Sequence, residues 1–157
     1  MISIGSAVPA CSLKVMGANG PEIFETADKF TGKKIVLFAV PGAFTPTCSA
    51  AHLPGYVVAY DDIIKAGADA IICLSVNDVF VMHAWGQSAN AEHLIMLADG
   101  NGTFTRALGL DKDASEYQMG TRSRRYAMII EDGILTHLAV DDKGLDQSSA
   151  EAILAKL

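Results

Sequence analysis

The sequence predicts one α/β domain in which a central mixed sheet is flanked by helices. Short, continuous apolar runs alternate with longer segments of helical pattern, an order typical of parallel strands covered by helices on both faces. Near the carboxyl end, Asp132-Gly133 separates two apolar runs, which is a strong signal for a two-residue hairpin of antiparallel strands. At 157 residues the chain has the length of a single domain, residues 1–157.

The first half of the chain begins with a short expected strand over residues 11–16 and a turn at 17–20. Residues 35–40 (IVLFAV) form a continuous apolar run, as expected for a central parallel strand that is buried on both faces. That run ends at Pro41-Gly42, and the pattern over residues 45–66 then predicts a helix.

The second half is expected to contain two further strands separated by a helix, followed by the hairpin: strand 70–76, helix 78–89, strand 94–98, and strands 125–130 and 134–140. The last helix is expected to begin at a capping box, Ser148-Ser149-Ala150-Glu151, and to run to Leu157. This order of elements is that of a thioredoxin-like fold with an N-terminal extension, in which the hairpin adds antiparallel edge strands.

Composition excludes several classes of function. The 12 Lys and Arg residues and 18 Asp and Glu residues leave a net charge of −6, which argues against a nucleic-acid partner because phosphate binding requires basic residues. No apolar run approaches the roughly 18 residues that a membrane helix needs, and the first residues do not resemble a signal peptide. We therefore expect no membrane partner and a cytoplasmic location. The three widely spaced cysteines are not a disulfide framework and suit a reducing compartment.

The segment Pro41–Cys48 (PGAFTPTC) lies at the carboxyl end of the first central strand, where open α/β sheets place their ligand sites. Thr45 is a good N-cap and Pro46 suits the first helical position, so Cys48 is expected in the first helical turn. Unpaired N–H groups and the helix dipole favour an anion there, and such a position lowers a thiol pKa into a range of about 3.5–7.5. The alternatives are that Cys48 is a small buried apolar residue and that Thr45 only caps the helix.

Pro41, Thr45 and Cys48 fit the P-x-x-x-T-x-x-C motif, and the chain in this respect resembles the peroxiredoxins. Longer strings resemble the type II, peroxiredoxin-5-like subfamily: PGAFTPTCSAAHLPGY at 41–56, SVNDVFVM at 75–82 followed by Trp85, and RSRRY at 122–126. The similarity extends from about Gly5 to Leu157. It implies a thiol-dependent peroxidase that acts in antioxidant defence and redox homeostasis and needs no bound cofactor.

The resemblance implies a catalytic role for four residues. Cys48 would attack one peroxide oxygen and become a sulfenic acid, while the other oxygen leaves with developing negative charge. That charge needs preorganised donors, which the Cys48 N–H and the guanidinium of Arg125 would supply. Thr45 would accept a hydrogen bond from the peroxide and donate one to the thiolate, and Pro41 would shield the sulfur from water.

Two further residues are expected beside this group. Arg122 matches a second arginine of the pattern, and His52, four residues after Cys48, would help to position the arginine. Without the motif, the stretch Arg122–Arg125 would be interpreted as a solvated basic entry to a strand. The pair of Cys48 and His52 offers too few ligands for a metal site, so no metal is expected.

The sulfenic acid must be reduced by a thiol. Some relatives carry a resolving cysteine near the start of the last helix, but residues 144–149 (GLDQSS) contain none. Cys73 is a possible resolving residue, although its apolar strand favours an inert core position. Cys11 could form an intermolecular disulfide. The simplest expectation is an external reductant, glutathione with glutaredoxin, with thioredoxin as the competitor.

Two other functions stay open. A redox sensor or chaperone-like binding protein would use the same thiol but would turn peroxide over slowly. A thiol–disulfide oxidoreductase would need a second cysteine close by, whereas Cys48 is followed by Ser49-Ala50-Ala51.

The resemblance also implies a homodimer that pairs through loops and helix ends near the active site. Phe44, Phe80 and Trp85 are the candidate contacts. The alternative is that all three side chains belong to the core.

Overall fold

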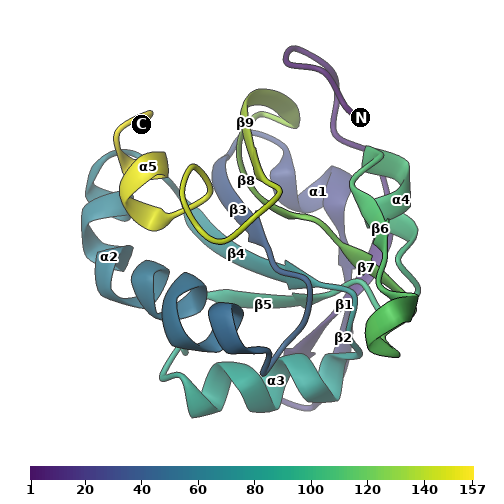
Figure 1. Ribbon diagram of the computed structural model, residues 1–157. Helices are drawn as coiled ribbons and strands as arrows, with labels where there is room; N and C mark the ends of the chain where they lie inside the picture. The colour runs from purple at the N-terminus through teal and green to yellow at the C-terminus, as the bar shows by residue number, and fades with distance from the viewer.

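The computed structural model describes all residues from 1 to 157 and contains a seven-stranded sheet with helices on both faces (Figure 1). Three parallel strands form its centre: β3 (Lys34–Ala39), β4 (Ala70–Ser75) and β5 (Ile95–Ala98). These strands are the three apolar runs of the sequence, because strands covered on both faces need apolar side chains at nearly every position.

An antiparallel hairpin lies on each side of this parallel centre. On one side, β8 (Arg125–Glu131) pairs with β3 and β9 (Ile134–Asp141) forms the outer strand. On the other side, β1 (Ser12–Gly17) pairs with β5 through one residue pair only, and β2 (Gly20–Glu25) forms the edge. The order across the sheet is β2-β1-β5-β4-β3-β8-β9. The expected C-terminal hairpin is present, but only β9 is an edge strand, because β8 pairs with β3 as well.

Five α-helices cover the sheet, and a π-helix and a 3₁₀ turn lie beside them. Their bounds are α1 Thr26–Phe30, α2 Leu53–Lys65, α3 Val79–Ser88, α4 Thr103–Leu108, α5 Ala150–Leu154, the π-helix Cys48–His52 and the 3₁₀ turn Ser115–Tyr117. A second, two-stranded sheet joins β6 (Asp111–Asp113) to β7 (Thr121–Ser123). None of these helices combines the length and the apolar character needed to cross a bilayer.

Alternate residues of the central strands point to opposite faces and build two hydrophobic cores. In β3, Val36 and Phe38 belong to the core beneath α2, α3 and α5, whereas Ile35 and Leu37 belong to the core beneath α1 and α4. Cys48 is part of the first of these cores. The chemistry expected at Cys48 is therefore confined to one face of the sheet.

The structure contains short elements that the sequence analysis does not predict, namely β2, α1, α4, β6 and β7. α4 is an instructive case because it follows Asp99-Gly100-Asn101-Gly102, a stretch typical of a turn. The buried Asp99 carboxylate accepts hydrogen bonds from the N–H groups of Phe104 and Thr105 and so stabilises the first turn of this helix. A helix of six residues is too short to show a clear hydrophobic period in the sequence.

The last helix differs from the expected capping box. Its capping residue is Ser149, whose hydroxyl accepts from the Ala152 N–H, and the helix ends at Leu154 rather than at the end of the chain. The hydroxyl of Ser148 donates to the Asp141 carboxylate instead. The expected register was therefore wrong by one residue, because Ser148 has a competing acceptor on β9.

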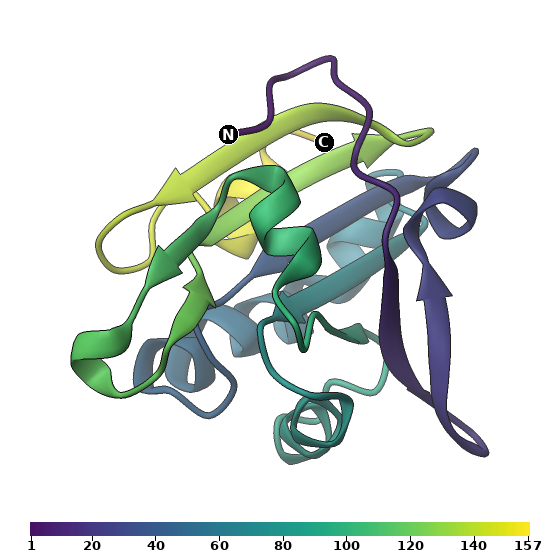
Figure 2. The ribbon, with the colours of Figure 1, turned by 90° about the vertical axis from the view of Figure 1, so that its right-hand side faces the viewer.

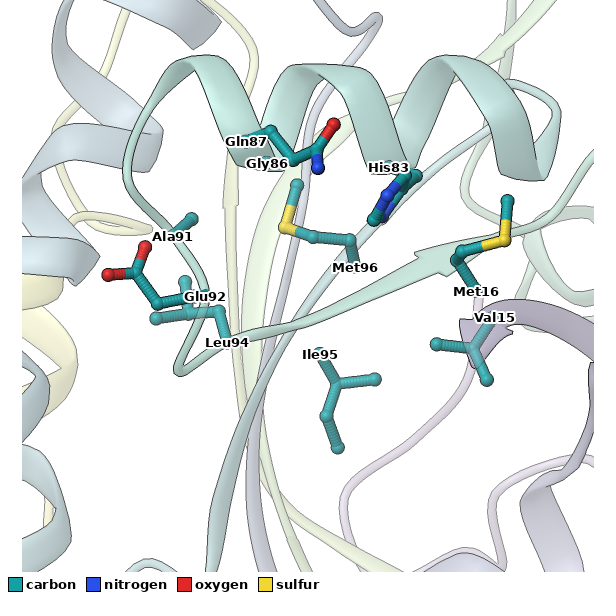
Figure 3. Close-up of a pocket in the computed structure, with 10 residues that line it drawn as sticks. All are labelled: Val15, Met16, His83, Gly86, Gln87, Ala91, Glu92, Leu94, Ile95 and Met96. Atoms are coloured by element: carbon teal, nitrogen blue, oxygen red, sulfur yellow. The ribbon is translucent and has the colours of Figure 1, made fainter. Parts of the chain in front are cut away.

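The β1–β2 hairpin diverges from the central strands, as Figure 2 shows, and α3 covers the opening as one wall of a cavity of about 500 Å³ (Figure 3). In this wall the Met96 side chain of β5 lies against Gly86 of α3. A Cβ atom on Gly86 would come within 2.7 Å of Met96 Cγ. On α2, a Cβ atom on Gly55 would meet Ala150 Cβ at an ordinary 3.9 Å. Close packing thus requires a glycine at the first position and not at the second.

Alanine substitutions at the two glycines test this packing. Alanine is more favourable than glycine inside a helix by about 0.5–1 kcal/mol, so Gly55→Ala should raise the free energy of unfolding by that amount. Gly86→Ala should lower it by about 1 kcal/mol, because overpacking costs about 1–3 kcal/mol and exceeds the gain in propensity. Urea unfolding of the two variants and the parent protein measures the difference. Equal stabilisation by both substitutions would contradict the packing of Met96.

Candidate active site

Cys48 lies near the start of the helical segment that follows β3. The chain leaves the strand at Ala39, turns through residues 41–45 and becomes helical at Pro46. Cys48 is the first residue of the π-helix, and its side chain is completely buried. Its sulfur accepts a hydrogen bond from Nη2 of Arg125 at 3.2 Å. The thiol therefore has the expected position in the first helical turn, with a cation directly against it.

The loop before Cys48 is held by its own hydrogen bonds. The Thr45 hydroxyl donates to the Gly42 carbonyl oxygen at 2.7 Å, and Asn77 Oδ1, which follows β4, accepts from the Ala43 N–H at 3.0 Å. Phe44 has a φ of 65°, a left-handed conformation that is uncommon outside glycine, and its ring is largely exposed. The expectation that the Thr45 side chain caps the helix was wrong, because its hydroxyl turns back into the loop.

Arg125 opens β8, and its guanidinium bridges two side chains of the π-helix. Nη2 points to the Cys48 sulfur, and Nη1 lies 2.8 Å from Nδ1 of His52. The other ring nitrogen, Nε2, lies 2.9 Å from the carbonyl oxygen of Ser148. A carbonyl can only accept and a guanidinium can only donate, so these contacts require a neutral His52 ring with its proton on Nε2.

The environment of His52 favours this neutral form. Burial is the main cause that lowers its pKa, from 6.5 to about 4; the hydrogen bond to Ser148 opposes the shift and the Arg125 charge adds to it. The ring also packs against Phe38, with the ring centroids 4.9 Å apart. His52 thus has a fixed orientation and stays an acceptor for the guanidinium near neutral pH.

A π-helix replaces the first turns of the helix that the sequence predicts over residues 45–66. The Leu53 N–H donates to the Cys48 carbonyl, five residues earlier, whereas an α-helix would use the residue four earlier. π-helical turns are rare and are frequent at functional sites. A single wide turn hardly changes the apolar pattern of a helix, and the sequence therefore gives no signal for it.

Arg122 borders the same loop, and Pro41, which is half-buried, is the first residue of that loop. Nε of Arg122 donates to the Met119 carbonyl and Nη1 to the Val76 carbonyl, each at 2.8 Å. The same Nη1 would lie 3.8 Å from a Cβ atom on Gly42. Arg122 therefore joins the segments that border the loop, while the guanidinium that reaches the sulfur is that of Arg125.

Trp85 belongs to the core and supports the helix that carries the thiol. Its side chain is 1% exposed, and its indole N–H donates to the Ser49 hydroxyl at 3.0 Å. The rings of Phe44 and Phe80, in contrast, are 54% and 64% exposed. Of the two hypotheses for Trp85, the structure supports the core position. A direct contact of this side chain with a second subunit is therefore not supported.

The sequence analysis missed three residues at the base of the site. The carbonyl oxygen of Ser148 accepts from the Tyr56 hydroxyl at 2.8 Å as well as from His52, and Asp141 binds the segment that contains Ser148. The function of Ser148 here comes from its backbone carbonyl, which no residue type reveals. Tyr56 falls within the string that resembles the type II subfamily, and that string was the one available signal.

The other two cysteines lie in different cores of the protein. Cys73 is completely buried on β4 in the same core as Cys48, and burial raises its pKa, with the nearby Cys48 as a smaller cause. Cys11 packs against the core on the opposite face of the sheet. All three cysteines are free, and no group of three or more His, Cys, Asp or Glu side chains is placed to hold a metal ion. The 500 Å³ cavity beside α3 shares no residue with this site.

Comparisons with known proteins show the family to which the chain belongs. A family model described as Redoxin matches residues 3–154. Peroxiredoxin-2B of Arabidopsis thaliana is 41% identical over 161 residues, which cover 99% of this chain and 98% of the relative. The chain belongs to the peroxiredoxins of the redoxin family. This peroxiredoxin is also 42% identical to peroxiredoxin sll1621 of Synechocystis over 151 residues, 88% of this chain and 80% of the relative.

Solved structures confirm the expected fold and class of activity. Reduced Prx3 of Vibrio vulnificus in complex with H₂O₂ is 50% identical to this peroxiredoxin, with a TM-score of 0.97 over 99% of both chains. Peroxiredoxin 5 of Alvinella pompejana is 37% identical, with a TM-score of 0.86 over 99% of this chain and 97% of the other. The protein is a thiol-dependent peroxidase, an oxidoreductase that uses a peroxide and a thiol reductant.

His52 should make the protein sensitive to acid. Its pKa is about 4 in the folded chain and about 6.5 in an unfolded one, so the unfolded chain binds more protons between these values. The stability that the neutral ring contributes is complete above about pH 6.5 and is lost as the pH falls to about 4, by up to about 3 kcal/mol. NMR titration should place the ring pKa near 4, and His52→Gln should unfold with a weaker dependence on pH in this window. A ring that titrates near 6.5 in the folded protein would contradict its burial.

Proposed function

We propose that Cys48 is the peroxidatic cysteine and that it reduces hydrogen peroxide and alkyl hydroperoxides. The contact that carries the proposal is the 3.2 Å hydrogen bond from Arg125 Nη2 to the Cys48 sulfur at the start of a helical segment. The thiolate attacks one peroxide oxygen, an S–O bond forms, and the O–O bond breaks. Sulfur is oxidised by two electrons to the sulfenic acid, and the second oxygen leaves as an alkoxide or hydroxide that takes a proton to become an alcohol or water.

The neighbouring groups suit the charge that develops on the leaving oxygen. Arg125 keeps its positive charge at any working pH and has further N–H groups to offer a peroxide. The Thr45 hydroxyl donates its proton to the Gly42 carbonyl, so the expected donation to the Cys48 thiolate is wrong in this structure. The lone pairs of the hydroxyl are available to accept a hydrogen bond from the peroxide O–H. We assign Pro41, half-buried at the start of the same loop, to the shielding of the sulfur from water. His52 holds the guanidinium, and Arg122 fixes the segments around the loop.

We propose that an external thiol regenerates the enzyme, with glutathione and glutaredoxin as the first pair and thioredoxin as the competitor. Residues 144–149 contain no cysteine, Cys73 is fully buried, and Cys11 lies across the sheet from Cys48. Cys73 is fixed in β4, which is paired with a strand on each side, and Cys11 packs on the opposite face of the sheet, so a disulfide with Cys48 is the less favoured route. A redox sensor or chaperone-like role would give slow turnover with the same thiol, so steady-state turnover with each reductant separates the two functions.

We also propose a homodimer in which Phe44 and Phe80 contribute to the interface. Both rings are exposed, and Phe44 lies beside Trp85 on α3, the helix that also carries Phe80. A contiguous exposed apolar patch is the kind of surface that marks an interaction site. Sedimentation velocity of the reduced protein tests the assembly, and Phe80→Asp should shift it to monomer.

The three free cysteines suit a reducing compartment such as the cytoplasm. Fractionation of the source cells would test this proposed location.

Intact mass after one equivalent of H₂O₂ tests the assignment of Cys48. The fully reduced protein should gain one oxygen atom, and later addition of glutathione with glutaredoxin should restore the original mass. Cys48→Ser should show no rapid gain, whereas Cys73→Ser should behave as the parent protein. The loss of two hydrogens in place of the gain would instead assign Cys73 as a resolving cysteine. No rapid change in the parent protein would sink the proposed chemistry at this site.

A pair of arginine substitutions tests the guanidinium. Arg125→Lys keeps the charge but loses the fork that reaches sulfur and His52 together, and it should slow the reaction with H₂O₂ about 10²-fold, the cost of removing one oxyanion donor. Arg124→Lys is the matched control, because Arg124 pairs with Asp142 at the surface and should stay within about twofold of the parent. Stopped-flow measurement gives the rate constants. Equal rates for both variants would remove Arg125 from the reaction.

A further inference from the structure

Asp141 stands directly opposite Arg125 in the ladder between β8 and β9, so the two side chains share one face of the sheet. They nevertheless form no ion pair; the ion pairs of the structure are Lys34–Glu131 and Arg124–Asp142. The carboxylate of Asp141 instead accepts four hydrogen bonds from the segment that leads into α5: the N–H groups of Asp146 at 3.0 Å, Gln147 at 3.0 Å and Ser148 at 2.9 Å, and the Ser148 hydroxyl at 2.6 Å.

These four bonds fix the direction of one backbone carbonyl. Once its N–H and hydroxyl are bound to Asp141, Ser148 can present its carbonyl oxygen only toward the π-helix and α2. That oxygen accepts from Nε2 of His52 at 2.9 Å and from the Tyr56 hydroxyl at 2.8 Å. The Tyr56 ring is fully buried and stacks on Phe38 with the centroids 3.9 Å apart, which restricts its orientation. The carbonyl therefore meets two rigid donors.

The direction of this carbonyl determines where the guanidinium lies. An acceptor at Nε2 keeps the His52 proton on that nitrogen, and Nδ1 is then left as an acceptor for Nη1 of Arg125 at 2.8 Å. With Nη1 held, Nη2 of the same planar group points at the Cys48 sulfur. If the carbonyl turned away, the ring could rotate or exchange its proton, and the guanidinium would lose its fixed aim.

We propose that Asp141 is a positioning residue for the peroxidase reaction: by binding residues 146–148 it directs the Ser148 carbonyl to His52 and thereby aims Arg125 at Cys48. This inference rests on the proposed roles of Cys48 and Arg125. Asp141 touches neither the sulfur nor the guanidinium, and it acts through the backbone of residues 146–148, which lie 21 to 23 residues after Arg125 in sequence.

The charge of Asp141 is suited to this task. Burial opposes ionisation, but the hydrogen bonds from Ser148, Asp146 and Gln147 outweigh it and bring the pKa to about 2. Both carboxylate oxygens are in use, with Oδ2 accepting three of the bonds. An asparagine has a single oxygen and would turn an N–H₂ donor toward other donors, so it cannot hold the segment in the same way. Titratable or charged groups near this carboxylate include Arg125 across the ladder, His52 and Tyr56 on the adjoining helices, and Asp146 in the bound segment.

Asp141→Asn is the direct test, and Asp142→Asn is its matched control. The two residues are adjacent on the chain, but Asp142 is exposed and pairs with Arg124. We expect Asp141→Asn to lower the rate constant of the reduced protein with H₂O₂ by about 10- to 100-fold, since a shift of about 1 Å caused by a distant substitution can cost about 10²-fold. Asp142→Asn should react at the parent rate. An unchanged rate in Asp141→Asn, with only its stability lowered, would overturn the inference.

A spectroscopic measurement distinguishes a positioning role from a purely structural one. The ¹⁵N shifts of the His52 ring should show a single neutral tautomer with the proton on Nε2 in the parent protein and a mixture in Asp141→Asn. The ring signals do not depend on peroxide chemistry, so this arm decides the inference even if the parent protein proves unreactive, a result that would instead refute the proposed function. A parent-like tautomer in a folded Asp141→Asn would contradict the positioning role.

Ser148→Ala provides a second variant if Asp141→Asn does not fold. It removes one of the four hydrogen bonds to the carboxylate and leaves the carbonyl in the chain. We expect a smaller loss of peroxide rate and a smaller change of the His52 signals, both in the same direction. A rate and a tautomer equal to those of the parent protein would argue against control of His52 through this segment.

Discussion

The site depends on one buried cation, the guanidinium of Arg125, which is 8% exposed and has no carboxylate within ion-pairing distance. A buried charge without compensation is costly. The two side chains that contact this guanidinium are a neutral imidazole, which offers a lone pair, and the sulfur of Cys48. Of these two groups, only the thiol has an anionic form that could compensate the charge. The sulfur is therefore the contacting group that can compensate the charge of Arg125. The surrounding fold holds the two together without a competing anion.

Four distant parts of the chain meet at this pair. The loop and the π-helix follow β3, and Arg125 is the first residue of β8. Asn77 follows β4 and lies behind the loop, and the Ser148 carbonyl belongs to the segment after β9. The hydrogen-bonded order β4-β3-β8-β9 places these elements side by side at one end of the sheet. Strands that are hydrogen-bonded on both sides move little. The register of the sheet therefore sets the distances between the groups that these strands position. The loop, the π-helix, Asn77 and residues 146–148 lie outside the ladder and are held by hydrogen bonds of their own.

Local sequence signals were sufficient for the central strands, the hairpin and the position of Cys48. Resemblance to a family added Arg125, which periodicity alone would have assigned to a solvated strand entry. Asp141 and Ser148 could not be found in this way, because their contribution is made through hydrogen bonds to backbone groups. The same bonds explain the error at the last helix: Ser148 looks like a cap until Asp141 is known to be its partner. Contacts between segments of distant sequence decide such cases, and one sequence does not contain them in readable form.

The hydrogen bond from Trp85 to Ser49 has a practical consequence. The chain contains one tryptophan, and its indole N–H is bound to the residue that follows the reactive cysteine. All indole emission of the protein therefore arises beside the thiol. Breaking this bond, or changing the charge on the adjacent sulfur, alters the polarity around the excited ring. The indole emission of the native protein is therefore expected to change when the thiol is oxidised, which would allow the reaction to be followed without a dye or added fluorophore.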